Sequence, residues 1–160
     1  MNEKDLLPPI GFLADLDSGA LARLACAGLF VTRPRGALLA VQGRPHHAMA
    51  LVLSGQVSVS VHAHGDRVEL ATLKRGDVVG EMSIIDPRVA SATARVTDES
   101  AHLWIIERDA FDEFIQHEPH NGLTLLKALG KVLCKRVRCD SELMLRKAEE
   151  MRSHFLDMDY

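Results

Sequence analysis

The sequence predicts a mainly β fold with flanking helices. Glycine, proline and aspartate residues that form turns recur about every 9 to 12 residues through the middle of the chain, a spacing typical of a sandwich, barrel or jelly roll. Short apolar or alternating runs lie between these turns, such as residues 57–61, whose valines point to one side and whose serines point to the other. On both sides of this region, apolar residues recur at the spacing of helices. With 160 residues, the chain is expected to form one domain.

The elements are expected in the following order. A short helix lies within residues 11–28, because Asp17 or Ser18 can cap its start and apolar side chains share one face. The strands are expected at 38–41, 51–53, 57–61, 92–96 and 102–106. A second helix follows over 108–117, and Pro119 ends it.

One long helix is expected over 122–155, which contains no proline and, after Gly130, no glycine. Its apolar positions are Leu126, Leu129, Leu133, Val137, Met144, Met151 and Phe155. Polar residues within 136–141 interrupt the heptad pattern, so a long coiled coil is not predicted. A helix of ~50 Å, at about 1.5 Å per residue, is longer than a small β domain can cover. We therefore expect a second subunit to pack against part of it and form a homodimer.

Composition and charge exclude several classes of protein. Hydrophobic residues make up 47% of the chain and charged residues 26%, as in a globular protein. No stretch approaches the ~18 apolar residues of a membrane span, and the polar start does not resemble a signal peptide. A cytoplasmic protein without membrane contact is therefore expected. The three cysteines, Cys26, Cys134 and Cys139, form no disulfide or metal pattern and are expected to be buried thiols.

The net charge of −3 argues against general binding to nucleic acid. The charge is nevertheless unevenly distributed, because residues 120–139 contain no acid. The basic residues of this segment are Lys127, Lys131, Lys135, Arg136 and Arg138. A solvated helix face is the expected explanation, and contact with an acidic partner is the alternative.

Signatures of the common enzyme classes are absent: the dinucleotide-binding, P-loop, zinc-protease and serine-hydrolase motifs do not occur. His62, His64 and Glu69 reproduce most of the first metal motif of the cupins, so a metal-dependent enzyme is a remote alternative. However, His64 starts what looks like a solvent-exposed hairpin turn, and we expect neither a metal nor an enzyme. His46 and His47 lie in a loop and are expected to be solvated.

The segment 76–96 contains the candidate binding site. Gly80 and Glu81 open a short helical turn whose free amides can face an anion. The small residues at 90–93 then bring hydroxyl and amide donors back to close range. A carboxylate, amides and hydroxyls in one short segment suit a sugar-phosphate ligand, with Glu81 accepting ribose hydroxyls and the amides holding the phosphate.

Several segments in fixed order resemble the cyclic-nucleotide-binding domain of catabolite-activator-type regulators, protein kinase A regulatory subunits and gated channels. They are FLADLDSGALARLA, LVLSGQVSV, ATLKRGDVVGEMSIID, SAT and HLWIIERDAFDEFI, and the resemblance covers about residues 12–133. It implies a jelly-roll-like β-roll of eight strands with a short N-terminal and a long C-terminal helix. In this interpretation, residues 1–160 form a single domain, with the roll and first helices over 12–118 and the long helix over 119–156.

The resemblance also implies a ligand, cAMP or cGMP, and the residues that bind it. Glu81 would bind the ribose 2′-hydroxyl, and Ser91 with the amide of Ala92 would bind the cyclic phosphate. The residues implied to line the pocket are Gly80, Glu81, Met82, Arg88, Ser91, Ala92 and Thr93. The domain would act as a sensor that reorients its long helix and signals to an unidentified protein partner.

One position departs from the family pattern, in which an arginine precedes the S-A-T run and pairs with the phosphate. Here the position is occupied by Ala90, and the nearest cation is Arg88. A second alignment instead treats 88–91 as the arginine-containing run. Loss of a charge-assisted hydrogen bond weakens affinity by roughly 10- to 150-fold. The alternative function is therefore a dimeric interaction module of the same fold that no longer binds cyclic nucleotide.

After the long helix only residues 157–160 remain, too few for a helix-turn-helix. We therefore expect a stand-alone module without a DNA-binding domain and without direct DNA contact.

Overall fold

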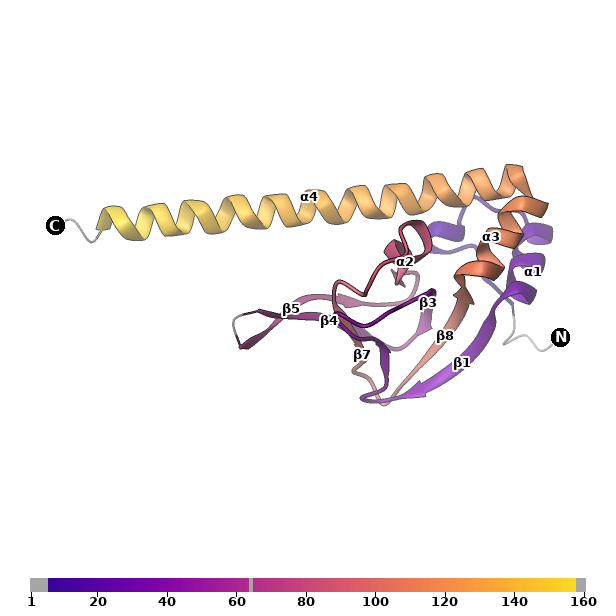
Figure 1. The fold of residues 1–160 in the computed structure, drawn as a ribbon, viewed down its shortest axis with the longest axis horizontal. Coiled ribbons are helices and arrows are strands. Elements are labelled where there is room, and N and C mark those ends of the chain that lie inside the picture. Colours follow the sequence, from indigo (N-terminus) through magenta and orange to yellow (C-terminus); the bar gives the residue numbers. More distant parts are fainter. Residues whose placement is uncertain (1–5, 64, 158–160) are drawn as a thin grey trace.

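Two four-stranded antiparallel sheets form the centre of the computed structural model, which describes residues 6–63 and 65–157. Their strand orders are β1-β8-β3-β6 and β2-β7-β4-β5 (Figure 1). The strands are β1 (Leu29–Pro34), β2 (Leu38–Ala40), β3 (Ala48–Ser54), β4 (Val57–Ala63), β5 (Asp66–Leu73), β6 (Val78–Val79), β7 (Thr93–Val96) and β8 (Ser100–Glu107). The mainly β prediction, with flanking helices, is confirmed.

Within the described residues, five helical segments flank these sheets. They are the 3₁₀ turn η2 (Gly11–Leu13) and the α-helices α1 (Ser18–Ala27), α2 (Glu81–Ile85), α3 (Arg108–His117) and α4 (Pro119–Asp157). Asp17 caps α1, because its carboxylate accepts a hydrogen bond of 2.8 Å from the amide of Ala20. Pro119 ends α3 as predicted and also begins α4, since proline suits the first position of a helix.

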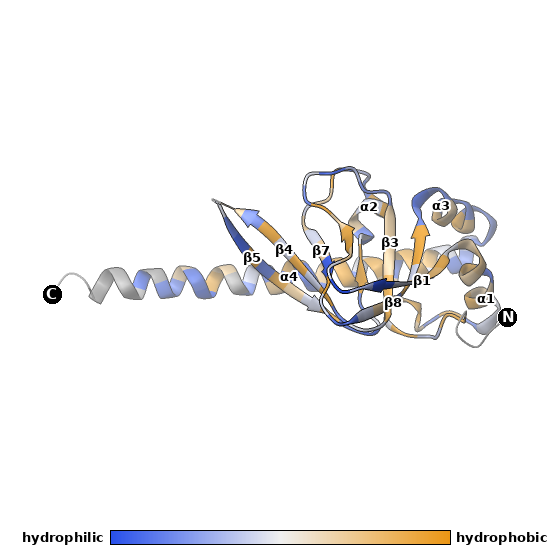
Figure 2. Ribbon diagram, turned by 90° about the horizontal axis from the view of Figure 1, so that it is seen from below, coloured by the Kyte–Doolittle hydropathy of each residue, from blue (hydrophilic) through white to orange (hydrophobic). Residues whose placement is uncertain are grey.

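The β3–β8 sheet is buried on both faces. In β3, Met49, Leu51 and Leu53 pack against the helices, whereas Ala50 and Val52 face the second sheet. The hydropathy colouring of β3 in Figure 2 follows this burial, and β5 at the edge of the second sheet is more hydrophilic. A strand buried on both faces reads as a continuous apolar run, which is the pattern of the sequence here. The molecule is therefore layered as helices, sheet and sheet.

The long helix α4 packs on the domain only near its start. Leu125 and Leu129 are fully buried in the layer between helices and sheet. By contrast, Val137 and Met144 are 64% and 72% exposed. Figure 1 shows the second half of α4 extending past the β4–β5 hairpin. The helix thus begins as a core element and ends as a projection.

The cysteine prediction is wrong, since Cys26, Cys134 and Cys139 are all exposed. Cys26 follows Leu24 and Ala25, which occupy the buried face of α1, and so falls on the outer face. The other two lie on the outer side of α4. Strands β1 and β5 were not predicted from the residues, because nearly all of β5 is exposed and shows no buried alternation. Among the described residues, no helix is long and apolar enough to cross a membrane.

Candidate ligand-binding site

A cavity of about 210 Å³ lies between the second sheet, α2 and α4. Its floor is formed by small and branched side chains of the strands, including Val59 and Ala94. Its rim is formed by α2 and by the loop from α2 to β7. Of the predicted site residues, Gly80, Glu81, Met82, Arg88, Ser91 and Ala92 line the cavity. Most of the predicted site residues, which lie within 80–92, therefore line one concave surface.

Gly80 fixes the start of α2 against the first residues of β3. Its backbone is in the left-handed region, with φ at 84°. A Cβ atom there would lie 2.3 Å from the carbonyl oxygen of Ala48 and 2.8 Å from Nε2 of His46. Only glycine fits this close approach. The position of Glu81, the next residue, depends on it.

Glu81 is a buried carboxylate paired with the long helix. Its side chain is 1% exposed, and its Oε1 accepts a hydrogen bond from the guanidinium of Arg136 in α4. The same guanidinium donates to the backbone carbonyl of Val78. A buried carboxylate is costly without such a partner. The pair therefore ties α4 directly to the cavity.

The two hydroxyl side chains of the run 91–93 lie in different places. Ser91 lines the cavity, and its hydroxyl lies 3.9 Å from the sulfur of Met82. Thr93 does not line the cavity, because its side chain belongs to β7 and its Oγ1 accepts a hydrogen bond of 3.1 Å from the amide of Gln42. Ser91 is thus the hydroxyl of this run that borders the cavity.

Ala90 and Arg88 lie in different environments. Ala90 is 7% exposed, and its amide and carbonyl bond to the backbone of the loop before β3. The Arg88 side chain is 78% exposed, and its Nε lies 2.8 Å from a carboxylate oxygen of Asp86. Arg88 therefore borders the cavity while its guanidinium is held by Asp86 at the rim.

Among the cavity-lining residues that were not predicted as site residues, Arg136 and His46 matter most for the charge of the cavity. Arg136 was read only as part of a basic stretch, since nothing in that stretch distinguishes the one arginine that faces the domain. His46 was expected to be solvated, but its ring is half-buried and lines the cavity. Burial lowers the pKa of His46, against the opposing effects of the Ala48 carbonyl and Glu107.

The cupin-like motif does not gain support from the fold. No group of three or more His, Cys, Asp or Glu side chains that could hold a metal occurs within residues 6–63 and 65–157. His64 lies outside the described residues. The backbone amide of His62 donates a 2.7 Å hydrogen bond to Oε1 of Gln42, which ties β4 to the residues after β2.

The model of the cyclic nucleotide-binding domain family matches residues 30–118, which include β2 to β8, all but the first residue of β1, and the cavity rim between α2 and β7. The chain belongs to this family. Cyclic nucleotide-binding domains form a regulatory family, and the match includes the predicted cassette, residues 80–93. The predicted β-roll and the predicted family are both confirmed.

Individual cyclic nucleotide-binding proteins show the same likeness. The chain is 30% identical over 132 residues to the CRP-like cAMP-activated global transcriptional regulator of Mycobacterium tuberculosis, covering 81% of this chain and 58% of that protein. A cyclic nucleotide-binding domain from Methylobacillus flagellatus matches with a TM-score of 0.78 and 25% identity, over 83% of this chain and 75% of that one. The catabolite activator protein of Thermus thermophilus matches with a TM-score of 0.73 and 27% identity, over 86% and 62%. The chain thus spans little more than half the length of its curated relative.

Proposed function

We propose that this domain binds a cyclic nucleotide, cAMP or cGMP, in the cavity beside α2 and signals through α4. The observation that carries the proposal is the buried Glu81 carboxylate in the cavity wall, held by an arginine from the helix that transmits the signal. A ligand that bonds to this carboxylate must act on the contact between cavity and helix. No catalytic residue is part of the proposal.

The ligand chemistry follows from the groups on the wall. Glu81 accepts hydrogen bonds from ribose hydroxyls, and the hydroxyl of Ser91 and the amide of Ala92 donate to the cyclic phosphate. Ala90 leaves the phosphate without the family's arginine. Arg88 and Arg136 are the arginines that line the cavity among the described residues, and each is paired with a carboxylate. Arg88 can bind the phosphate when its guanidinium releases the carboxylate of Asp86.

Signalling operates as a population shift. Arg136 bonds to Glu81 and holds α4 in one position. A ligand whose ribose hydroxyl competes with Arg136 for this carboxylate binds the protein with a different affinity for each position of α4. This difference in affinity shifts the equilibrium between the two helix positions. The output passes through α4 to an unidentified protein partner. The proposal places the domain in the cytoplasm and includes no direct contact with DNA.

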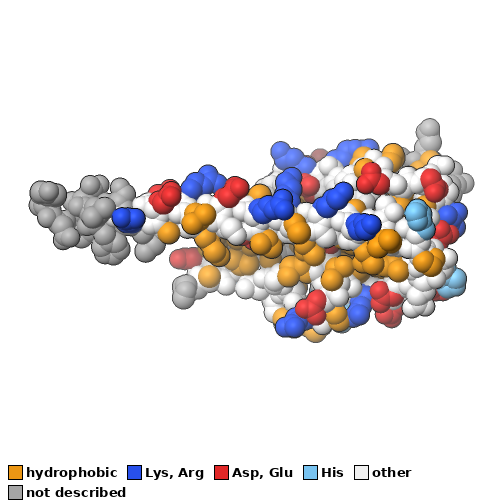
Figure 3. Space-filling view, turned by 90° about the horizontal axis from the view of Figure 1, so that it is seen from above, with side chains coloured by type: hydrophobic (Ala, Val, Ile, Leu, Met, Phe, Trp, Pro, Cys, Tyr) orange, Lys and Arg blue, Asp and Glu red, His pale blue; other side chains and the backbone are white. Residues whose placement is uncertain are grey.

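The proposed functional unit is a homodimer. An apolar seam on α4 is defined as Leu123, Leu126, Val137 and Met144, which are 3, 11 and 7 residues apart, and each member is at least 37% exposed. Figure 3 shows hydrophobic side chains in a row along this helix with lysine and arginine side chains next to it. Such a row matches the seam of a two-helix contact. A second copy of α4 is the proposed partner of this seam.

Isothermal titration with cAMP and cGMP tests the ligand. Micromolar binding is expected for the wild type, with a loss of roughly tenfold or more in Glu81→Ala and in Arg88→Ala. Arg44→Ala, a change outside the cavity lining, is the control and is expected to bind as the wild type does. Absence of heat up to millimolar nucleotide, from folded and nucleotide-free protein, would instead support the ligand-free dimeric module.

A further inference from the structure

We propose that His46 is a proton-controlled cation of the cavity, which contacts the phosphate of the bound nucleotide and makes its affinity depend on pH. The inference rests on the proposed function, because it assigns a further binding residue to the same cavity.

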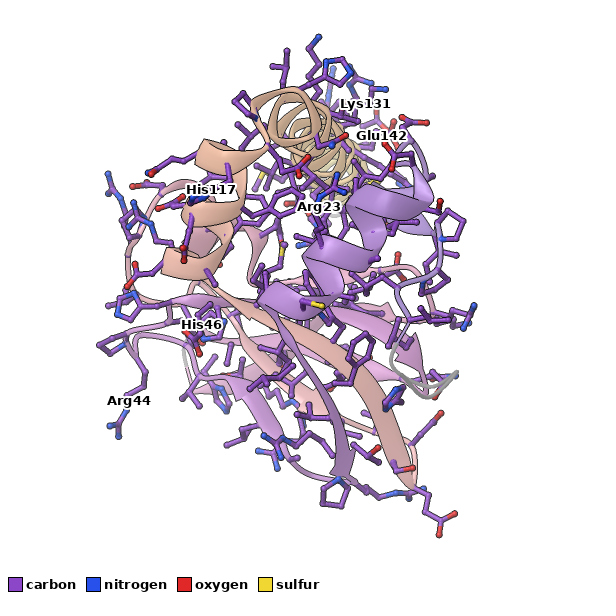
Figure 4. All side chains as sticks on the ribbon, turned by 90° about the vertical axis from the view of Figure 1, so that its right-hand side faces the viewer. Arg23, Arg44, His46, His117, Lys131 and Glu142 are labelled. Atoms are coloured by element: carbon purple, nitrogen blue, oxygen red, sulfur yellow. The ribbon has the colours of Figure 1, made fainter. Side chains whose placement is uncertain are left out.

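The position of His46 is set by the loop between β2 and β3. Figure 4 shows Arg44 of this loop reaching away from the domain, whereas His46 lies closer to the strands. The His46 ring borders the cavity and lies against Gly80, so close that a Cβ on that glycine would be 2.8 Å from Nε2. Glu81, the proposed ribose ligand, follows directly. The ring therefore stands beside the part of the cavity where ribose and phosphate are proposed to lie.

The other ionisable groups of the cavity wall are already paired. Arg136 bonds to Glu81, and Arg88 bonds to Asp86. Among the described residues that line the cavity, His46 is the ionisable side chain without an ion pair. Because Ala90 occupies the position of the family's arginine, a ligand phosphate lacks a fixed cation there. A protonated imidazole can supply that charge without breaking either pair.

Burial of the His46 ring disfavours its charged form, whereas a nearby anion favours it. Burial lowers the pKa of His46, and the charge of His47 acts in the same direction. The Ala48 carbonyl and Glu107 act in the opposite direction and favour the charged ring. From the other elements around the cavity, Glu81, Arg136, Asp86 and Arg88 face it as paired charges. A phosphate adds one unpaired negative charge, which raises the pKa of His46.

Binding should therefore take up a proton. Between the pKa of the free protein and the higher pKa of the complex, affinity falls by up to about tenfold for each unit of rising pH. Below the pKa of His46 in the free protein, and above its pKa in the complex, the affinity does not depend on pH. The wild type is thus expected to bind more tightly at pH 6 than at pH 8.

The experiment is titration with cAMP from pH 5.5 to 8.5, in pairs of buffers with different ionisation enthalpies, for wild type, His46→Gln and His47→Gln. We expect proton uptake and tighter binding at low pH in the wild type and in the matched control His47→Gln, whose side chain is exposed and outside this cavity. In His46→Gln we expect both effects to vanish and affinity at pH 6 to fall roughly tenfold. Ring NMR signals of the wild-type protein provide a second measurement, in which cAMP should raise the pKa of His46.

The outcomes separate the two proposals. Binding of cAMP with the same pH dependence in His46→Gln as in wild type, and an unchanged pKa of His46 by NMR, would overturn the assignment of His46 and leave the proposed function intact. Absence of binding by the folded wild type at every pH would overturn the proposed function and this inference with it.

Discussion

At the scale of single residues, Gly80 determines whether the cassette can form. Alanine at this position would have to adopt a left-handed backbone, which costs roughly 1–2 kcal/mol. It would also overlap the Ala48 carbonyl, and such overpacking costs about 1–3 kcal/mol more. We predict that Gly80→Ala lowers the free energy of unfolding by about 2–5 kcal/mol, measured by denaturant unfolding.

Gly43 provides a matched control for this substitution. Its φ of 76° is also left-handed, but a Cβ there meets no atom within 4 Å. Gly43→Ala therefore carries the backbone cost without the overlap. Equal destabilisation of the two variants would contradict the role given to the close approach at Gly80.

The ion pair between Glu81 and Arg136 gives a second prediction at this scale. Arg136→Ala leaves a buried carboxylate and a backbone carbonyl without their donor, which is expected to lower the free energy of unfolding by about 1–3 kcal/mol. The value stays below that of a fully buried pair, because the Arg136 side chain is 38% exposed. Lys135→Ala, an exposed neighbour on the same helix, is the control. If the two variants unfold at the same denaturant concentration, the pair does not hold α4 to the domain.

At the scale of elements, the junction of α3 and α4 is fastened to α1 by Arg23. Its guanidinium bonds to both carboxylate oxygens of Glu118, and Asn121 donates a further bond of 2.8 Å. Hydrogen bonds from Arg23 first, and then from Asn121, lower the pKa of Glu118 in the folded protein. A lowered pKa stabilises the fold above the carboxyl's ordinary pKa, and this stabilisation is lost as the pH falls through the lowered value.

The resulting prediction concerns Arg23→Ala. At pH 7 the variant should be less stable than the wild type, and the difference should shrink as the pH falls below the ordinary carboxyl pKa of 4.5. Thermal unfolding from pH 3 to 7 measures both proteins. A difference that is constant over this range would show that Arg23 acts through packing rather than through the charge of Glu118.

The sequence predicts elements well where a cap or a clear alternation of residue types marks them. The α1 helix has its aspartate cap, and β4 has its alternating valines and serines, so both were placed from the residues alone. The edge strand β5 pairs with β4 but is almost entirely exposed, so its hydrophobic pattern gives no signal. The exposed cysteines show the same limit, because the general tendency of thiols to be buried does not say on which face of a helix they lie.

The predicted cassette was chosen for its small and polar residues, but the sequence did not predict that distant residues complete the cavity around it. Arg136 reaches Glu81 across 55 positions of sequence, and His46 reaches Gly80 from a different loop. Neither contact leaves a local periodic signal, since both depend on how the sheets and α4 are packed. Most of the predicted site residues line the cavity, whereas Arg136 and His46, two side chains that contribute to its charge, were not predicted.

At the scale of the whole molecule, the exposed seam of α4 predicts the oligomeric state. Val137→Glu places a charge in the middle of this seam, where a second helix would have to desolvate it. We expect the wild type to be a dimer and Val137→Glu a monomer by analytical ultracentrifugation. Lys135→Glu alters charge beside the seam and is expected to remain dimeric. A monomeric wild type across micromolar concentrations would contradict the prediction.

Under the proposed function, the projecting half of α4 would act as a lever arm. From residue 137 to residue 157 the helix extends for about 30 Å, at about 1.5 Å per residue, beyond the Arg136 contact that fixes its inner part. A tilt of about 10° at that contact would displace the far end by about 5 Å, given this length. A rearrangement of one hydrogen bond inside the cavity would thus become a displacement large enough for another protein to detect.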